Sequence, residues 1–129
     1  MQRNMDLVRD LLLRLEALPI RIGEAYMLTV TGPPLVLADE DANEISYNMQ
    51  LLADAGFLDL TRSQPALGFC IKGLTWQGHD FLDSVRDPEI WRRTKEGAQR
   101  AGGFTVGLLG ELAKGLIKTQ IEKHTGVKL

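Results

Sequence analysis

His79 and Asp83 are the side chains in this sequence whose types and spacing come nearest to catalytic chemistry. They lie four residues apart in a predicted helix, so an imidazole and a carboxylate share one helix face. General-base catalysis also needs a nucleophile or a substrate pocket, and the sequence nominates neither. We therefore expect His79 to be structural, bonded to backbone or to Asp83 and pinning its helix to a neighbouring hairpin. We predict no catalytic residue and no enzyme activity.

Metal-ligating residue types are present, but their spacing does not match that of a metal site. Cys70, His79 and His124 are too scattered to supply three or four ligands. Asp80 and Asp83 lie at helical spacing, which is typical of a solvated helix face. We expect no metal and no other cofactor. Cys70 is the only cysteine, so an intrachain disulfide is excluded, as is usual in a reducing compartment.

A predicted helix over residues 40–55 carries polar side chains that could read DNA bases. Its expected outward face consists of Asn43, Tyr47, Gln50 and Asp54. Asn43 and Gln50 can bond adenine edges in the major groove, and Tyr47 and Asn48 can assist. However, residues 39–54 contain five acids and no base, whereas nonspecific affinity for DNA depends on Lys and Arg contacts to phosphate. This helix is therefore predicted to be a contact surface for either DNA or a protein.

The cations that could hold phosphate lie outside this helix. Two are on the following hairpin and the others further along the chain: Arg62, Lys72, Arg86, Arg92, Arg93, Lys95 and Arg100. Of these we take Arg62, Lys72, Arg92 and Arg93 as tentative contact residues. An ordinary charged helix surface is the alternative interpretation of the same residues.

Two tryptophans could also contact a partner. Trp76 and Trp91 each lie beside an apolar helical stripe. Stacking on bases and filling a partner's pocket are both possible uses of such rings. Large aromatic side chains more often pack in the interior, so we expect both rings to be in the core or between helices.

The composition is that of one globular domain, with 129 residues, 44% hydrophobic content and a net charge of −2. The charge is uneven, since residues 1–85 carry twelve acids and six bases, whereas residues 86–129 carry five acids and nine bases. The charged N-terminus does not resemble a signal peptide, and no apolar run is long enough to span a bilayer. We expect a cytoplasmic protein.

The first half of the chain predicts helices and short strands. Asn4 can cap a helix that Pro19 ends, and residues 26–31 and 35–37 favour one or two strands, at least one of which pairs with a later hairpin. After the helix over 40–55, residues 57–61 and 67–72 alternate as a hairpin whose tip is 62–66. Thr75 then caps a third helix that ends at about residue 85.

The second half is predicted to be helical. Asp87 and Pro88 begin a helix to about residue 100, and a last amphipathic helix covers about residues 106–123. We predict a winged-helix-like domain over residues 1–100 and a C-terminal segment, 101–129. That segment packs on the domain or forms a homodimer seam through residues 106–123.

Several separated strings resemble one bacterial and phage family, domain of unknown function 2513. They are Arg3–Val8, Leu51–Phe57, Leu74–Asp83, Asp87–Trp91 and Thr94–Lys95. The resemblance covers roughly residues 1–120. It implies a winged-helix-like fold and occurrence in prophages and mobile elements, but no established activity and no catalytic residue.

The fold class predicted is therefore α+β, a winged helix-turn-helix-like domain with a small hairpin wing and additional C-terminal helices. The function predicted is a non-catalytic binding module, a DNA-binding regulator of the phage or mobile-element type. The alternative is a protein-binding adaptor or inhibitor that applies the acidic face of residues 39–54 to a basic partner. The DNA-binding function rests on fold analogy and on Asn43, Tyr47 and Gln50, and fold analogy is a weak warrant.

Overall fold

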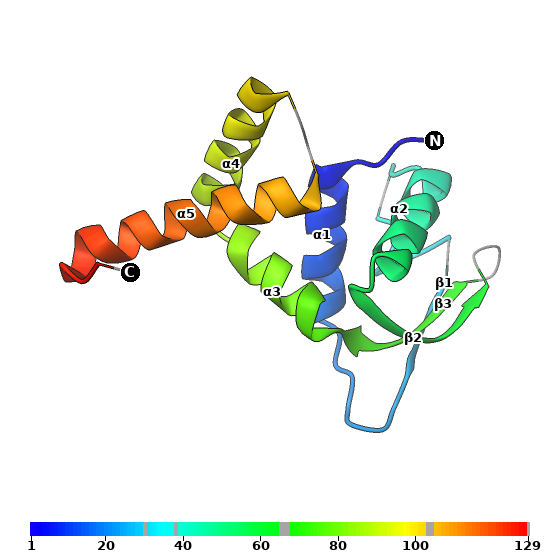
Figure 1. The fold of residues 1–129 in the computed structure, drawn as a ribbon. Coiled ribbons are helices and arrows are strands. Elements are labelled where there is room, and N and C mark those ends of the chain that lie inside the picture. The colour runs from blue at the N-terminus through cyan, green and yellow to red at the C-terminus, as the bar shows by residue number, and fades with distance from the viewer. Residues whose placement is uncertain (30, 38, 65–67, 103–104, 129) are drawn as a thin grey trace. The chain divides into compact units, whose positions relative to one another are not determined.

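The computed structural model describes residues 1–129 except 30, 38, 65–67, 103–104 and 129, and it does not describe the side chains of residues 62–64, 101 and 106. Its elements are, in chain order, α1 (Met5–Glu16), β1 (Tyr26–Thr29), α2 (Ala42–Asp54), β2 (Leu58–Gln64), β3 (Gly68–Leu74), α3 (Trp76–Val85), α4 (Pro88–Ala101) and α5 (Val106–Thr125) (Figure 1). The described residues thus form five helices and a three-stranded antiparallel sheet, which confirms the α+β class.

The first helix forms where capping and periodicity predicted it. The Asn4 side chain accepts a hydrogen bond from the Leu7 amide, which satisfies one of the free N–H groups at the start of α1. Its apolar stripe is buried, with Val8, Leu11 and Leu12 each no more than 3% exposed. This stripe is part of the core of the protein, where α1 contacts both α2 and β3.

The sheet has the order β1-β3-β2, so the first strand pairs with the hairpin as predicted. Leu28 lies opposite Phe69, and both are buried on the face that meets the helices. Met27 lies opposite Cys70 on the other face, where Met27 is 61% exposed. Strand β1 aligns regularly with β3, whereas β2 has register shifts on both sides of Leu60.

Of the one or two strands expected over residues 26–31 and 35–37, one forms, whereas the predicted limits of the hairpin tip are wrong. Residues 35–37 are in a turn segment, where Leu35 and Val36 are buried without belonging to a strand. The predicted hairpin tip was also too long, because Arg62 pairs with Cys70 inside β2. The rest of that predicted tip, and Leu67, lie at least partly outside the described residues. Glycine and proline near residue 33 account for the turn at residues 35–37, since they favour turns over a continuous strand.

Helix α3 begins where Thr75 joins it to the end of α2. The Thr75 hydroxyl bonds the Gly56 carbonyl and accepts from the Gly78 amide, and the Thr75 amide donates to the Phe57 carbonyl. Gly78 is buried at this junction, and a Cβ there would lie 2.2 Å from the Phe57 carbonyl oxygen. Only glycine fits this close approach of helix and strand.

The chain divides into two compact units, which we call the N-terminal unit (Met1–Asp80) and the C-terminal unit (Phe81–Leu129). In the C-terminal unit, Asp87 caps α4, and α4 packs against α5 with Ala98, Leu109 and Ala113 fully buried. These units do not test the domain boundary expected after residue 100, which stays a prediction. Among the described residues, no helix combines the length and apolar character that crossing a membrane requires.

Candidate interaction surface

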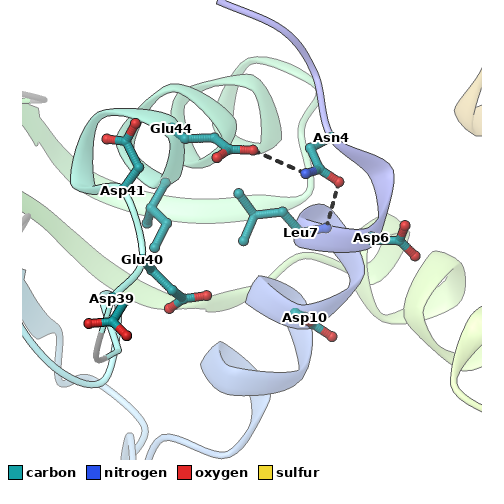
Figure 2. A pocket seen from close by; sticks show the side chains of 9 residues that line it. Asn4, Asp6, Leu7, Asp10, Asp39, Glu40, Asp41 and Glu44 are labelled. Carbon is teal, nitrogen blue, oxygen red and sulfur yellow. Dashed lines mark hydrogen bonds between the residues drawn. The ribbon is translucent and has the colours of Figure 1, made fainter.

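An acid-lined pocket of about 430 Å³ lies between the N-terminal ends of α1 and α2. Its lining consists of Asn4, Asp6, Leu7, Asp10, Asp39, Glu40, Asp41, Glu44 and Ile45. Figure 2 shows Leu7 reaching from α1 toward the α2 side, with Asp6 and Asp10 on one side and Asp39 and Asp41 on the other. The pocket therefore combines an apolar floor, Leu7 and Ile45, with six surrounding carboxylates. We call this set of nine residues the acidic pocket.

One wall of the acidic pocket is held in place by a bidentate ion pair between Arg14 and Glu40. The Arg14 guanidinium donates from two nitrogens to the two carboxylate oxygens of Glu40, at 2.9 and 2.8 Å, and also to the Leu35 carbonyl. Glu40 in turn accepts from the Leu37 amide. These bonds hold the segment before α2 against α1, because a paired guanidinium and carboxylate constrain each other's orientation.

The Arg14 and Leu37 hydrogen bonds lower the pKa of Glu40 below its ordinary value of 4.5. The charged form accepts these bonds, so the protein favours it over the protonated acid. Glu40 is therefore ionised in the folded protein at neutral pH. Its first role is structural, and its charge contributes to the field of the acidic pocket only in combination with Arg14.

The other wall is fixed by a buried asparagine. Asn48 is fully buried, accepts a hydrogen bond from the Asn4 amide at 2.9 Å and donates to the Glu44 carbonyl. Glu44 also accepts from the Asn4 side chain at 3.0 Å. This network ties the start of α1 to the first turns of α2. The expectation that Asn48 assists base reading is wrong, because its amide is already satisfied inside the protein.

Asp41 caps α2 by accepting from the Asn43 amide at 2.9 Å. Carboxylates near a helix N-terminus are favoured by the helix dipole, which accounts locally for Asp41 and Glu44. Asp39, Asp41, Asp6 and Asp10 are all exposed. Across the described residues, no three His, Cys, Asp or Glu side chains are arranged to hold a metal ion.

The predicted outward residues of α2 lie on its less buried side. Asn43 and Asp54 are exposed, and Tyr47 and Gln50 are half-buried. The Gln50 side-chain amide donates to Asp54 at 2.9 Å, so the group that would meet a base edge is held by a carboxylate. All four residues therefore lie on α2, and the acidic pocket borders the N-terminal end of this helix.

The predicted phosphate contacts are distributed over both units. Lys72 is exposed on β3, and Arg62 belongs to β2 with its side chain outside the described part. Arg92 and Arg93 belong to α4 in the C-terminal unit. Glu89 and Glu96 both pair with Arg92, and Glu89 raises its guanidinium pKa further above the ordinary range. Arg92 is thus part of an ion-pair network along its own helix.

His79 does not pair with Asp83. Its Nδ1 lies 3.7 Å from a Glu16 carboxylate oxygen, whereas Asp83 bonds Arg86 at 2.7 Å. The imidazole is half exposed. The expected pairing with Asp83 is wrong, and the structural role of His79 stays a prediction. The four-residue spacing suggested Asp83, on the same helix, as the partner of His79. It could not show that Glu16 of α1 lies close to the imidazole.

Trp76 is exposed, which corrects the expectation that it packs inside. The Trp76 side chain is 82% exposed, whereas Trp91 is 5% exposed and lies under Lys95, whose Nζ is 5.7 Å from the ring centroid. Trp76 occupies the first position of α3, one residue after the Thr75 junction. The Trp76 side chain is therefore not part of the buried stripe formed by Phe81, Leu82 and Val85 on the same helix.

The sequence interpretation missed the α1 side of the acidic pocket. Asp6 and Asp10 were not among the predicted contact residues, whereas the structure places both beside the carboxylates of residues 39–44. Helical periodicity could have indicated that Asp6 and Asp10 share a face. Their approach to α2 depends on tertiary packing and has no signature in local sequence.

Comparisons with known proteins agree with the strings quoted above. The family described as hypothetical protein (DUF2513) matches residues 2–104, and the chain belongs to this family. An "Uncharacterized protein" of Haemophilus influenzae is 33% identical over 97 residues, which cover 74% of this chain and 76% of that protein. No solved structure matches the chain.

Proposed function

We propose that the protein is a non-catalytic binding module whose N-terminal unit receives a cationic segment of a partner protein. The observation that carries this proposal is the acidic pocket, in which six carboxylates, two of them ion-paired (Asp10 with Arg9 and Glu40 with Arg14), lie around Leu7 and Ile45. A lysine or arginine side chain offers a matching combination, because its alkyl stem covers apolar surface while its charged end stays among carboxylates.

The charge of the whole N-terminal unit supports the same partner. Residues 1–80 contain eleven acids and six bases, a net charge of −5. Complementary charge speeds encounter and disfavours partners of the same sign. This negative charge disfavours the approach of duplex DNA to α2, because DNA has the same sign of charge. Helix α2 itself contains no Lys or Arg.

DNA binding is the second candidate, because one observation favours it. Helix α2 runs directly into the hairpin β2–β3, and β1 completes a sheet of order β1-β3-β2. This arrangement supports a winged-helix-like fold for the N-terminal unit, in which α2 would be the recognition helix. Asn43 and Tyr47 on α2 and Lys72 on the hairpin would then face the groove. We rank this function second, since fold analogy does not supply phosphate contacts.

A salt titration distinguishes the two functions. Fluorescence anisotropy is measured for the full chain with a labelled octalysine peptide and, separately, with a labelled duplex DNA of mixed sequence. The proposal predicts peptide binding that weakens as salt increases, and no saturable DNA binding at low ionic strength. Salt-dependent DNA binding in the absence of peptide binding would instead establish the second candidate.

A further inference from the structure

Trp76 and Asp80 form a second feature of the N-terminal unit that the acidic pocket does not include. Trp76 is 82% exposed, although a tryptophan has more apolar surface to bury than any other residue. Asp80 is exposed one helical turn later on α3. Residues four apart on a helix are neighbours, with Cβ atoms about 5–6 Å apart. An aromatic ring and a carboxylate are therefore presented together to solvent.

This pair suits an arginine side chain. A guanidinium can stack its plane on an indole ring while it donates hydrogen bonds to a carboxylate beside the ring. Lysine is a poorer match, because its ammonium is compact, strongly hydrated and has no plane to stack. Tryptophan and arginine are also the residue types that most often dominate binding energy at interfaces.

Trp76 lies at the opposite end of α2 from the acidic pocket. The Thr75 backbone and side chain bond Phe57 and Gly56, the residues that follow α2, so Trp76 starts beside the C-terminal end of that helix. Helix α2 has 13 residues and is about 20 Å long at 1.5 Å per residue. An extended segment of about six residues spans this distance.

The exposed side of α2 between these ends carries no cation that would repel such a segment. Asn43 and Asp54 are exposed there, and Asp54 lies in the last turn, close in sequence to Gly56. Helix α2 therefore adds acidic and no basic charge between the acidic pocket and its C-terminal end.

We propose that Trp76 and Asp80 receive an arginine of the cationic partner segment, whose other basic residue occupies the acidic pocket about six residues away. This inference rests on the proposed function and specifies its partner, a segment with two basic residues at that separation, one of them arginine.

Comparison of arginine and lysine peptides tests this proposal. Labelled octa-arginine and octalysine peptides have the same charge and length, and their affinities for the full chain are measured by anisotropy at one ionic strength. Octa-arginine is expected to bind about three- to fivefold more tightly. Trp76→Ala removes that preference and leaves the octalysine affinity unchanged, whereas Trp76→Phe retains part of it and Asp80→Asn reduces it.

Met27→Ala is the matched control, because Met27 is an exposed apolar residue of the same unit, on β1. It should preserve the preference for octa-arginine, and circular dichroism should show that each variant melts as the wild type does. Equal affinity for both peptides in the wild type, or a preference that survives Trp76→Ala, would overturn the arginine assignment while the proposed function stands. Failure of both peptides to bind would overturn both proposals. Loss of single-stranded DNA binding in Trp76→Ala, with no arginine preference, would instead assign the ring to base stacking.

Discussion

Helices α1 and α5 carry similar apolar stripes in sequence and bury them to different degrees. In α1, Leu11 and Leu12 are fully buried because the helix contacts both α2 and β3. In α5, which packs on α4 within its own unit, Leu109 is fully buried, Leu116 is half-buried and Ile121 is 39% exposed. The difference teaches that periodicity identifies the apolar face of a helix and does not show how much of that face a neighbour covers.

Truncating one leucine in each stripe tests whether the two helices differ in burial. Leu12→Ala should lower the free energy of unfolding by about 2–5 kcal/mol, because it leaves a cavity in a core that cannot collapse fully. Leu116→Ala should cost less, since part of its side chain is already in water. Urea denaturation followed by circular dichroism measures both. Equal losses would mean that α5 is covered as completely as α1.

Glycine-to-alanine substitutions in α3 and α5 should also differ in their effect on stability. Gly78→Ala should destabilise the protein by about 1–3 kcal/mol, because the new Cβ would lie 2.2 Å from the Phe57 carbonyl oxygen and force the junction apart. The control is Gly115→Ala on α5, where, beyond its chain neighbours and the adjacent helix backbone, the added Cβ would meet no described atom within 4 Å.

Helix propensity alone then applies to Gly115→Ala, which should stabilise by up to about 1 kcal/mol. Thermal unfolding compares the two variants. An unchanged or raised melting temperature for Gly78→Ala would contradict the close approach of α3 to the strand.

A smaller effect is expected at the wall of the acidic pocket. Glu40→Gln should cost about 1 kcal/mol at neutral pH, because it removes a charged partner of Arg14 from a partly exposed pair. The pKa of Glu40 is lowered in the folded state, so its contribution is complete above its ordinary value of 4.5 and disappears as pH falls through the lower folded pKa.

The stability difference between wild type and Glu40→Gln should therefore shrink in acid. Urea denaturation at neutral pH and at several acidic values measures it. A difference that stays constant down to the lowest pH would show that the effect arises from packing and not from ionisation.

Capping residues, helical periodicity and alternation were enough to predict most elements. Asn4 and Asp87 each cap the helix expected, and α2 covers most of the helix predicted over residues 40–55. These features are local, because a cap or a stripe is encoded within a few residues of the backbone groups it satisfies.

Predictions that depended on distant contacts were less successful. The partner of His79 is Glu16, which lies on another helix, and the buried Asn48 bonds the chain start 44 residues away. The exposure of Trp76 was likewise not apparent from the apolar residues that follow it in sequence. The acidic pocket combines two separated stretches, so the sequence indicated only its α2 side.

The carboxylates of the acidic pocket are proposed to receive a cationic segment. The most direct test compares Asp39→Asn/Asp41→Asn with Glu24→Gln/Asp59→Asn, which removes equal charge from exposed acids of the same unit that do not line the pocket. Asparagine caps a helix as well as aspartate, so α2 should persist. Octalysine affinity is measured by anisotropy at low salt. The pocket variant should bind octalysine at least about threefold more weakly than the wild type, whereas the affinity of the control variant should change little. Equal weakening by both variants would contradict this proposal.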